Sequence, residues 1–215
     1  MEATLREVVV ADRWFGRGRL RFRRYLAAKY VLDWLFAAAA LVLASPLFAA
    51  IAAAIALDTP GPIIFTQRRI GVHSHEFTIR KFRTMRRDTP HIATDLMAAA
   101  PVDYTTRMGR LLRRFSLDEL PNLINVLRGD MSVVGPRPAL YNQHELIAMR
   151  RRGACDLMRP GLTGWAQING RNLISLDEKV RLDEFYVRNC SILTDARIIV
   201  RTLAVMLKKE DMPQR

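Results

Sequence analysis

The chain has 215 residues, half of them hydrophobic, so it can form one domain with a core and lacks the composition of a disordered protein. Its formal net charge of +13, from 34 Lys and Arg against 21 Asp and Glu, indicates an anionic partner: nucleic acid, anionic lipid or a phosphorylated substrate. Cys155 and Cys190 are far apart, and His73 and His75 have no nearby Cys or acidic residue, which argues against a disulfide framework and a zinc site.

Residues 1–28 are predicted to form a basic N-terminal extension. The end of this extension overlaps the sequence RGRLRFRRYLAAKY, in which Arg is interleaved with Leu, Phe and Tyr. Such a stretch fits a basic helix on an anionic lipid surface, and it fits an unstructured basic tail equally well.

Residues 29–57 are predicted to be a membrane segment. From Val31 onward they read VLDWLFAAAALVLASPLFAAIAAAIAL, apolar except for Asp33 and Ser45, and about 20 apolar residues suffice to cross a bilayer. Two features argue against a simple span: Pro46 removes a backbone donor at the middle, and both flanks are basic, which places both ends on the cytoplasmic side. Two topologies remain open, a kinked helix that crosses and a re-entrant helix that breaks at Ser45–Pro46 and leaves on the side where it entered.

From residue 58 onward the chain is more polar and is punctuated by turns. A Pro-Gly turn leads into a short β-branched run at Thr59–Phe65, and EFTIRKFRTM, residues 76–85, alternates as a strand does. Four later stretches are predicted to be helices, and they are residues 117–127, 140–153, 176–189 and 195–209. The segment RPGLTGWAQINGR is interpreted as a Gly-rich loop. The result is a predicted α-rich α+β fold whose amphipathic helices lie at the membrane interface.

The stretch RRFSLDELPNLI sets Asp118 and Glu119 between an Arg pair and an apolar run. Ser116 followed by Glu119 is a capping box, which predicts a helix with Ser116 at its N-cap and a carboxylate kept ionised by the helix dipole. The two carboxylates can also do chemistry, and adjacent helical positions point about 100° apart, so the two should have different tasks. The residues of this stretch are compatible with both interpretations.

Several cations lie in short turns and strands of the kind that bind phosphate. Lys81 and Arg83 share one side of the predicted strand, and Arg137 lies between two prolines in GPRP. Arg159 and Arg171 bracket the Gly-rich loop, whose glycines would let backbone N–H groups approach a ligand. Each alone is more often a solvated charge, but together they predict a site for several phosphate oxygens, since the Arg fork matches phosphate. The chain has no GxGxxG, Walker, HExxH or GxSxG motif, which removes several common enzyme classes.

Four ordered motifs resemble those of the bacterial sugar transferase family, the small monotopic polyprenyl-phosphate phosphoglycosyl transferases. They are QRRIGVHSHEFTIRKFRTM, RRFSLDELPNLINVLRGDMSVVGPRP, RPGLTGWAQINGR and LDEFYVRNCSILTD, within a similarity that runs from about Lys29 to Lys208. The resemblance implies a re-entrant membrane helix broken at Ser45–Pro46 and a cytoplasmic catalytic domain, here residues 58–215. It also implies transfer of a sugar 1-phosphate from a UDP-sugar to polyprenyl phosphate with release of UMP, as the first membrane step of glycan or exopolysaccharide assembly.

The resemblance further implies roles for individual residues. Asp118 would attack the sugar-bearing phosphate and form a covalent intermediate that the lipid phosphate resolves. Glu119 would help to hold Mg²⁺, which neutralises the diphosphate. The basic residues that match family positions or motifs are Arg113, Arg137, Lys81 and Arg83.

The chain departs from the family pattern at Ser74–His75, where members often have Gly-Lys or Gly-Arg. It also lacks the several N-terminal membrane helices and the extra domain of larger relatives, so we expect a minimal catalytic unit with a basic extension. The expected location is the bacterial inner membrane, with the catalytic domain on the cytoplasmic face. The expected partners are a UDP-sugar, polyprenyl phosphate and anionic lipid, without nucleic acid and with a homo-oligomer left open.

Two rival functions explain parts of the pattern. A membrane-anchored nucleic-acid-binding or interaction protein would account for the charge and the Arg clusters, but it would need no Asp118 and would have a spanning helix. A metal-dependent phosphatase or nucleotide-sugar hydrolase would use the same carboxylates and transfer the sugar phosphate to water instead of lipid.

Overall fold

The protein is described by a computed structural model at residues 18–87, 89, 104–170 and 174–207. Within these ranges the α-helices are α2 (Arg19–Leu43), α3 (Ser45–Asp58), α5 (Arg107–Arg114), α6 (Leu123–Arg128), α7 (His144–Arg152), α8 (Trp165–Asn169), α9 (Leu176–Arg188) and α10 (Ile192–Leu207). The strands are β1 (Ile64–Ile70), β2 (Glu76–Phe82), β3 (Ser132–Val134), β4 (Ala139–Leu140) and β5 (Gly161–Thr163). Short 3₁₀ helices are η2 (Val72–Ser74), η3 (Leu117–Asn122) and η4 (Cys155–Leu157). This is the α-rich α+β fold that the sequence predicts.

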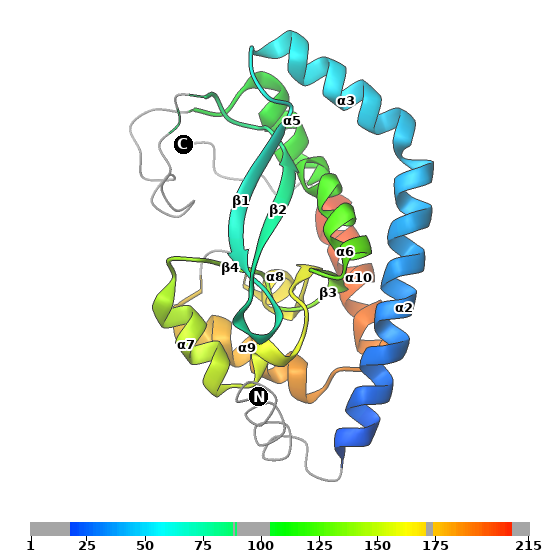
Figure 1. The fold of residues 1–215 in the computed structure, drawn as a ribbon, viewed down its shortest axis with the longest axis vertical. Coiled ribbons are helices and arrows are strands. Elements are labelled where there is room, and N and C mark those ends of the chain that lie inside the picture. Colours follow the sequence, from blue (N-terminus) through cyan, green and yellow to red (C-terminus); the bar gives the residue numbers. More distant parts are fainter. Residues whose placement is uncertain (1–17, 88, 90–103, 171–173, 208–215) are drawn as a thin grey trace.

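The apolar segment forms α2 and α3, which meet at Ala44. Pro46 lies in the first turn of α3, where a missing N–H breaks no helical hydrogen bond, and the Ser45 hydroxyl donates to the carbonyl oxygen of Val42 at 2.8 Å. Figure 1 shows α2 along one side of the molecule and α3 leaning from its end toward α5 and the β1–β2 hairpin. Among the described residues, Leu20–Leu43 is the one helix long and apolar enough to cross a membrane. Helix α2 begins at Arg19, inside the predicted basic extension.

The outward surface of α2 is apolar over much of its length. The large apolar residues of α2 that are more than half exposed are Leu20, Val31, Trp34, Leu35, Phe36, Val42 and Leu43. The exposure of many large apolar side chains on one helix is unfavourable in water and favourable in the hydrocarbon core of a bilayer. This surface supports association of the protein with a membrane.

Two small sheets hold the turn that carries Arg137. The first is antiparallel with strand order β2-β1-β4, and the second is a parallel pair of β3 and β5. Because residues 135–138 connect β3 to β4, this turn joins the two sheets and is fixed at both of its ends.

Apolar clusters attach the two apolar helices α2 and α3 to the rest of the protein. Phe22 of α2 packs in a cluster with Tyr186 and Ile198, and Ala37 packs with residues of β2 and α6. Ile51 and Ile55 of α3 pack with Phe82 of β2 and Leu112 of α5. The helices α2 and α3 are therefore part of one packed body with the sheets.

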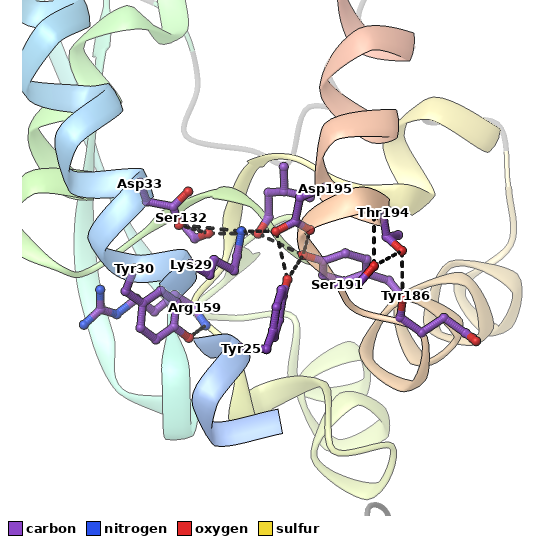
Figure 2. Close-up of polar contacts among 12 residues, drawn as sticks. Tyr25, Lys29, Tyr30, Asp33, Ser132, Arg159, Tyr186, Ser191, Thr194 and Asp195 are labelled. Atoms are coloured by element: carbon purple, nitrogen blue, oxygen red, sulfur yellow. Dashed lines mark hydrogen bonds and ion pairs between the residues drawn. The ribbon is translucent and has the colours of Figure 1, made fainter. Parts of the chain in front are cut away.

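A polar cluster also joins α2 to the C-terminal half, and we call it the α2–α10 polar cluster (Figure 2). Lys29 is 2% exposed and lies between two carboxylates, with its Nζ 2.9 Å from Asp195 Oδ2 and 3.6 Å from Asp33 Oδ2. Ser132 donates a hydrogen bond to Asp33. Tyr25 and Tyr186 donate to Asp195 at 2.9 and 2.7 Å, which completes the cluster.

The prediction of one continuous α-helix over residues 117–127, started by a capping box, is wrong. Ser116 has a left-handed backbone with φ of 53° and makes no side-chain cap, and the segment starts as η3 before α6 takes over at Leu123. Pro121 inside η3 has no N–H to donate, which favours the short 3₁₀ form over a continuous α-helix. Gly129, with φ of 82°, ends α6 in the left-handed conformation, as expected of a C-cap glycine.

Two other local predictions need correction. The segment 159–171 is not only a loop, because it contains β5 and the short helix α8. The helix predicted at 140–153 is shorter, since Leu140 belongs to β4 and α7 starts at His144. The predicted strand 76–85 and the predicted helices 176–189 and 195–209 correspond to β2, α9 and α10.

Candidate active site

A cleft lies where β2, η3 and the turn 135–138 meet. It is open to solvent, and its charged lining residues are Arg69, Lys81, Glu119 and Arg137. Two buried amides hold η3 and α6 against the backbone of β2: Asn122 Oδ1 accepts from the Arg80 N–H at 3.0 Å, and Asn125 Nδ2 donates to the carbonyl of Thr78 at 2.7 Å. This docking brings Glu119 opposite Lys81.

Glu119 is the centre of the charge network in the cleft. Its Oε1 accepts from Lys81 Nζ at 2.5 Å and from Arg137 Nη2 at 3.4 Å. Burial on its own would raise the pKa of Glu119, but the positive charges of Lys81 and Arg137 prevail and lower its pKa to about 2. Glu119 is therefore ionised well above pH 2.

Asp118 has a different environment, although it is the next residue. Its side chain is buried, with 9% of the residue exposed. Burial raises the pKa of Asp118 above the ordinary 3.8 and the charge of Glu119 adds to the rise, while Lys81 and Arg113 oppose it. This upward direction is opposite to the one expected from a helix dipole, because η3 is only six residues long and burial outweighs the nearby cations.

Arg137 is positioned by buried residues that the sequence analysis missed. Arg150 is 8% exposed, and it donates to Asp183 Oδ2 through Nε at 3.0 Å and Nη2 at 2.6 Å. Its Nη1 donates to the carbonyl oxygen of Arg137 at 2.6 Å. The Arg150–Asp183 pair thus fixes the backbone that carries Arg137. Three arginines follow one another at 150–152, and the sequence alone does not indicate that one of them is buried.

Arg69 is a second residue that the sequence analysis did not place in the site. It lines the cleft, donates to the carbonyl of Pro138 at 3.2 Å and to Gln67 Oε1 at 2.7 Å, and has a buried Nε without a hydrogen bond. Burial and the nearby charge of Arg137 lower the pKa of Arg69 to about 10, with Glu119 opposing them. A lowered Arg pKa indicates a cation that the protein does not fully neutralise.

The other predicted phosphate-binding residues lie in different places. Arg113 is close enough to lower the pKa of Asp118, and its Nε donates to Thr84 Oγ1 at 3.0 Å. Arg83 is buried and donates to Thr59 and Pro60, in the turn that follows α3.

Of Arg159 and Arg171, predicted at the two ends of the Gly-rich loop, the structure describes only Arg159. The guanidinium of Arg159 stacks on the ring of Tyr30 in α2 at 3.9 Å. Arg171 lies outside the described residues.

The glycines of the segment 159–171 serve backbone packing. A Cβ on Gly161 would lie 2.1 Å from the backbone N of Gly135, and a Cβ on Gly164 would lie 2.1 Å from the carbonyl oxygen of Gly135. Gly161 and Gly164 therefore allow close contact with the turn of Arg137, and the approach of N–H groups of this segment to a ligand stays a prediction.

The cleft is suited to a magnesium ion that a phosphate substrate shares. Among the described residues no three His, Cys, Asp or Glu side chains gather as a complete metal site. Mg²⁺ usually needs only one or two carboxylates when substrate phosphates supply other ligands. Glu119 meets this need, because it is ionised and both of its cations contact Oε1 and not Oε2.

Comparison with known proteins assigns the chain to a family. The family model described as "Bacterial sugar transferase" matches residues 24–209. The chain belongs to the bacterial sugar transferase family. All the described residues of the cleft fall inside that match.

Three curated relatives in the bacterial sugar transferase family illustrate the likeness. The chain is 40% identical to the UDP-glucose:undecaprenyl-phosphate glucose-1-phosphate transferase of Xanthomonas campestris pv. campestris over 190 residues. The aligned residues cover 85% of this chain and 39% of that protein. A protein of the same name from Caulobacter vibrioides is 40% identical over 192 residues, 85% of this chain and 71% of the relative. The exopolysaccharide production protein ExoY of Sinorhizobium fredii is 38% identical over 200 residues, 85% of this chain and 87% of the relative. This chain thus spans well under half of the first relative and most of the other two.

Proposed function

We propose that the chain is a phosphoglycosyl transferase that moves a sugar 1-phosphate from a UDP-sugar to undecaprenyl phosphate in exopolysaccharide synthesis, with Asp118 as the nucleophile. The observation that carries the proposal is a buried carboxylate, Asp118, beside the network of Lys81, Glu119 and Arg137. The family match and the names of the relatives supply the reaction class, the donor and the acceptor.

The reaction has two displacements at the same phosphorus. A carboxylate oxygen of Asp118 attacks the sugar-bearing phosphorus, and the bond between that phosphorus and the bridging oxygen breaks. The electron pair leaves on the bridging oxygen, so UMP departs and the sugar phosphate remains on Asp118 as an acyl phosphate. An oxygen of the lipid phosphate then attacks this phosphorus, the bond to Asp118 breaks, and the carboxylate is restored.

The charges in and beside the cleft suit a diphosphate substrate. The cations outnumber the two carboxylates, and they are Arg69, Lys81, Arg113 and Arg137. Fixed positive groups stabilise the negative charge that develops as the phosphoryl group moves. Glu119 would hold Mg²⁺ here, and the ion would add neutralising charge to the diphosphate.

The packing of α2 and α3 supports the re-entrant topology. With 14 residues, α3 is about 21 Å long at 1.5 Å per residue, which is less than the roughly 30 Å of a bilayer core. Both ends of the segment belong to one packed body, because Phe22 and Lys29 contact the C-terminal half and α3 packs on β2 and α5. We place the catalytic domain on the cytoplasmic face of the inner membrane, where UDP-sugars are available and the basic flanks meet anionic lipid.

The test measures transfer of the sugar-bearing phosphate from the UDP-sugar to the protein and then to the lipid. Purified protein is mixed with Mg²⁺ and a UDP-sugar that carries ³²P in the sugar-bearing phosphate, without lipid acceptor. We expect label on the protein and release of an equal amount of UMP, with loss of the label on hydroxylamine, which cleaves acyl phosphates. Added undecaprenyl phosphate should move the label into lipid.

Two variants make this test specific. Asp118→Asn should abolish labelling, whereas Asp177→Asn, an exposed Asp in the first turn of α9, should label as the wild type does. Label that passes to water with lipid present would favour the hydrolase, and nucleic-acid binding without UMP release from any UDP-sugar would favour the interaction protein.

A further inference from the structure

The first half of the turn 135–138 is hydrogen-bonded to the segment of strand β5. The N–H of Gly135 donates to the carbonyl oxygen of Thr163 at 2.9 Å, and the carbonyl oxygen of Pro136 accepts from the N–H of Gly161 at 3.0 Å. Backbone bonds of this kind are what a buried turn needs. The beginning of the turn is therefore fixed by the small parallel sheet of β3 and β5.

The second half of the turn is fixed by arginine side chains. The carbonyl oxygen of Arg137 accepts from Arg150 Nη1 at 2.6 Å, and the carbonyl oxygen of Pro138 accepts from Arg69 Nη1 at 3.2 Å. Hydrogen bonds from a charged donor are roughly twice as strong as those between neutral groups. Two consecutive carbonyls thus have cationic donors, and the backbone is held at the residue from which the side chain of Arg137 extends.

The side chain of Arg137 is held much less firmly than its backbone. It is 48% exposed, and its Nη2 lies 3.4 Å from Glu119 Oε1, which is long for a hydrogen bond. A half-exposed guanidinium can turn toward a phosphate group while its backbone stays in place. The position of the backbone therefore decides which part of the cleft the guanidinium can reach.

Arg150 is in turn oriented by Asp183 of α9. Its Nε and Nη2 both donate to Asp183 Oδ2, at 3.0 and 2.6 Å, and both residues are buried. Because the guanidinium is planar, these two bonds set the direction in which Nη1 points toward Arg137. A buried ion pair is weak evidence for stability, since apolar residues of similar volume are often as stable or more so. An apolar pair, however, could not donate a hydrogen bond to the turn.

We infer that Arg150 and Asp183 are positioning residues for the transfer of the sugar phosphate, and that they act through the backbone of Arg137. The inference rests on the proposed function, because it takes Arg137 to bind the diphosphate of the UDP-sugar. A misplacement of about 1 Å, caused far from the reacting atoms, can slow a reaction by about 100-fold. The packing of α7 on α9 would in this way contribute to the rate at the cleft.

An apolar replacement separates positioning from stability. The double variant Arg150→Met/Asp183→Leu removes both charges and the bond to the turn, and its free energy of unfolding should be unchanged or higher. In this variant we expect single-turnover release of UMP from the UDP-sugar to slow roughly 10- to 100-fold. The matched control is Arg152→Met, at an exposed position of the same helix, which should keep the wild-type rate. A wild-type rate in the folded double variant would overturn the inference.

The variant Arg137→Gln shows whether the effect passes through Arg137. Added to Arg137→Gln, the double replacement should slow UMP release by about twofold or less, because the side chain that it misplaces is already gone. The affinity for UDP, measured calorimetrically in micelles with the same proteins, should show the same pattern and needs no turnover. An equal loss with and without the Arg137 side chain would mean a purely structural role and would overturn the inference.

A conservative variant keeps the test independent of the folding of the double variant. Arg150→Lys retains a positive charge beside Asp183 but lacks the planar fork that joins Asp183 to the turn. We expect UMP release to slow roughly 10-fold or more, with about twofold or less in the Arg137→Gln background. A wild-type rate in Arg150→Lys, or the same loss in both backgrounds, would contradict the positioning role.

The two proposals fail in distinguishable ways. If the proposed function is wrong, wild-type protein acquires no label at Asp118 and releases no UMP from UDP-sugars. If only the positioning role is wrong, wild-type protein is labelled and releases UMP, while the variants of Arg150 and Asp183 keep its rate or lose the same fraction of it with and without the Arg137 side chain.

Discussion

Asp118 and Glu119 are adjacent residues whose carboxylates have opposite surroundings. Glu119 is held ionised by Lys81 and Arg137, with a pKa of about 2, whereas burial raises the pKa of Asp118. A carboxylate with a higher pKa is a better nucleophile. It is also protonated at a higher pH, so its activity is lost first as the pH falls. The sequence analysis assigned different tasks to the two residues, and the structure adds an electrostatic reason for the division.

This difference predicts the pH dependence of covalent labelling. The attacking form of Asp118 is deprotonated, so the single-turnover rate of UMP release should fall as the pH drops through a pKa that lies above 3.8. Glu119 should contribute no second acidic limb, since it stays ionised down to about pH 2. Lys81 lowers the pKa of Asp118, and Lys81→Gln should therefore move the acidic limb to higher pH. Rates measured from about pH 4 to pH 8 test this, and an unmoved limb in Lys81→Gln would contradict it.

The motifs located part of the site and missed another part for a physical reason. Lys81, Asp118, Glu119 and Arg137 stand in motifs and meet around one cleft or beside it. The tasks of Arg69 and Arg150 depend on partners far away in the chain, and no local pattern separates them from solvated arginines.

At the scale of the elements, strand and helix signals were reliable where one face is apolar. Helices α9 and α10 and strand β2 follow periodic patterns and appear where they were predicted. The segment after Ser116 was mispredicted, because the side chains of Asn122 and Asn125 bind it to β2, and this tertiary contact competes with helix continuation. Arg83 directly follows the end of this strand, and its surroundings favour a role in anchoring a turn.

We expect Arg83→Ala to affect stability more than substrate binding. Arg83 donates to the carbonyl and hydroxyl oxygens of Thr59 at 2.6 and 2.8 Å and to the carbonyl of Pro60 at 3.1 Å. Loss of these charge-assisted bonds should lower the free energy of unfolding by about 2–3 kcal/mol. The measurement is urea unfolding in micelles, combined with KM for the UDP-sugar, and the exposed Arg128→Ala is the control. A large rise in KM at unchanged stability would instead support the substrate-binding role predicted from sequence.

The break between α2 and α3 predicts the accessibility of the two flanks. With Cys155 and Cys190 replaced, single cysteines at Leu20 and Phe65 should react with a membrane-impermeant maleimide from the same side of sealed vesicles. A cysteine at Asp177 in α9 marks the side of the catalytic domain. Labelling of the two flanks from opposite sides would show a spanning helix and would refute the re-entrant topology.

At the scale of the whole molecule, a buried ionic cluster joins the apolar helix α2 to helix α10. The α2–α10 polar cluster connects residues 166 positions apart, through the hydrogen bond from Lys29 to Asp195. Lys29 and Asp33 looked like ordinary polar residues at the start of an apolar segment. Long-range pairs of this kind are set by tertiary packing and have no signature in local sequence.

Removal of Lys29 should be strongly destabilising. In Lys29→Met the carboxylates of Asp33 and Asp195 remain buried without their shared cation, which should cost about 3–5 kcal/mol of unfolding free energy. The double variant Lys29→Met/Asp195→Asn removes one of the two charges and should be more stable than the single variant. Chemical unfolding of the four proteins of this double-mutant cycle measures the coupling. Additive effects would mean that Lys29 and Asp195 act independently.

The α2–α10 polar cluster also sets an order of events during biosynthesis. Lys29 leaves the ribosome 166 residues before Asp195, which is roughly 8–33 s at 5–20 residues per second. During that interval the nearest carboxylate to Lys29 along the nascent helix is Asp33, one turn away. The young helix α2 thus carries a counter-ion of its own, and Asp195 joins Lys29 and Asp33 only after helix α10 has been made.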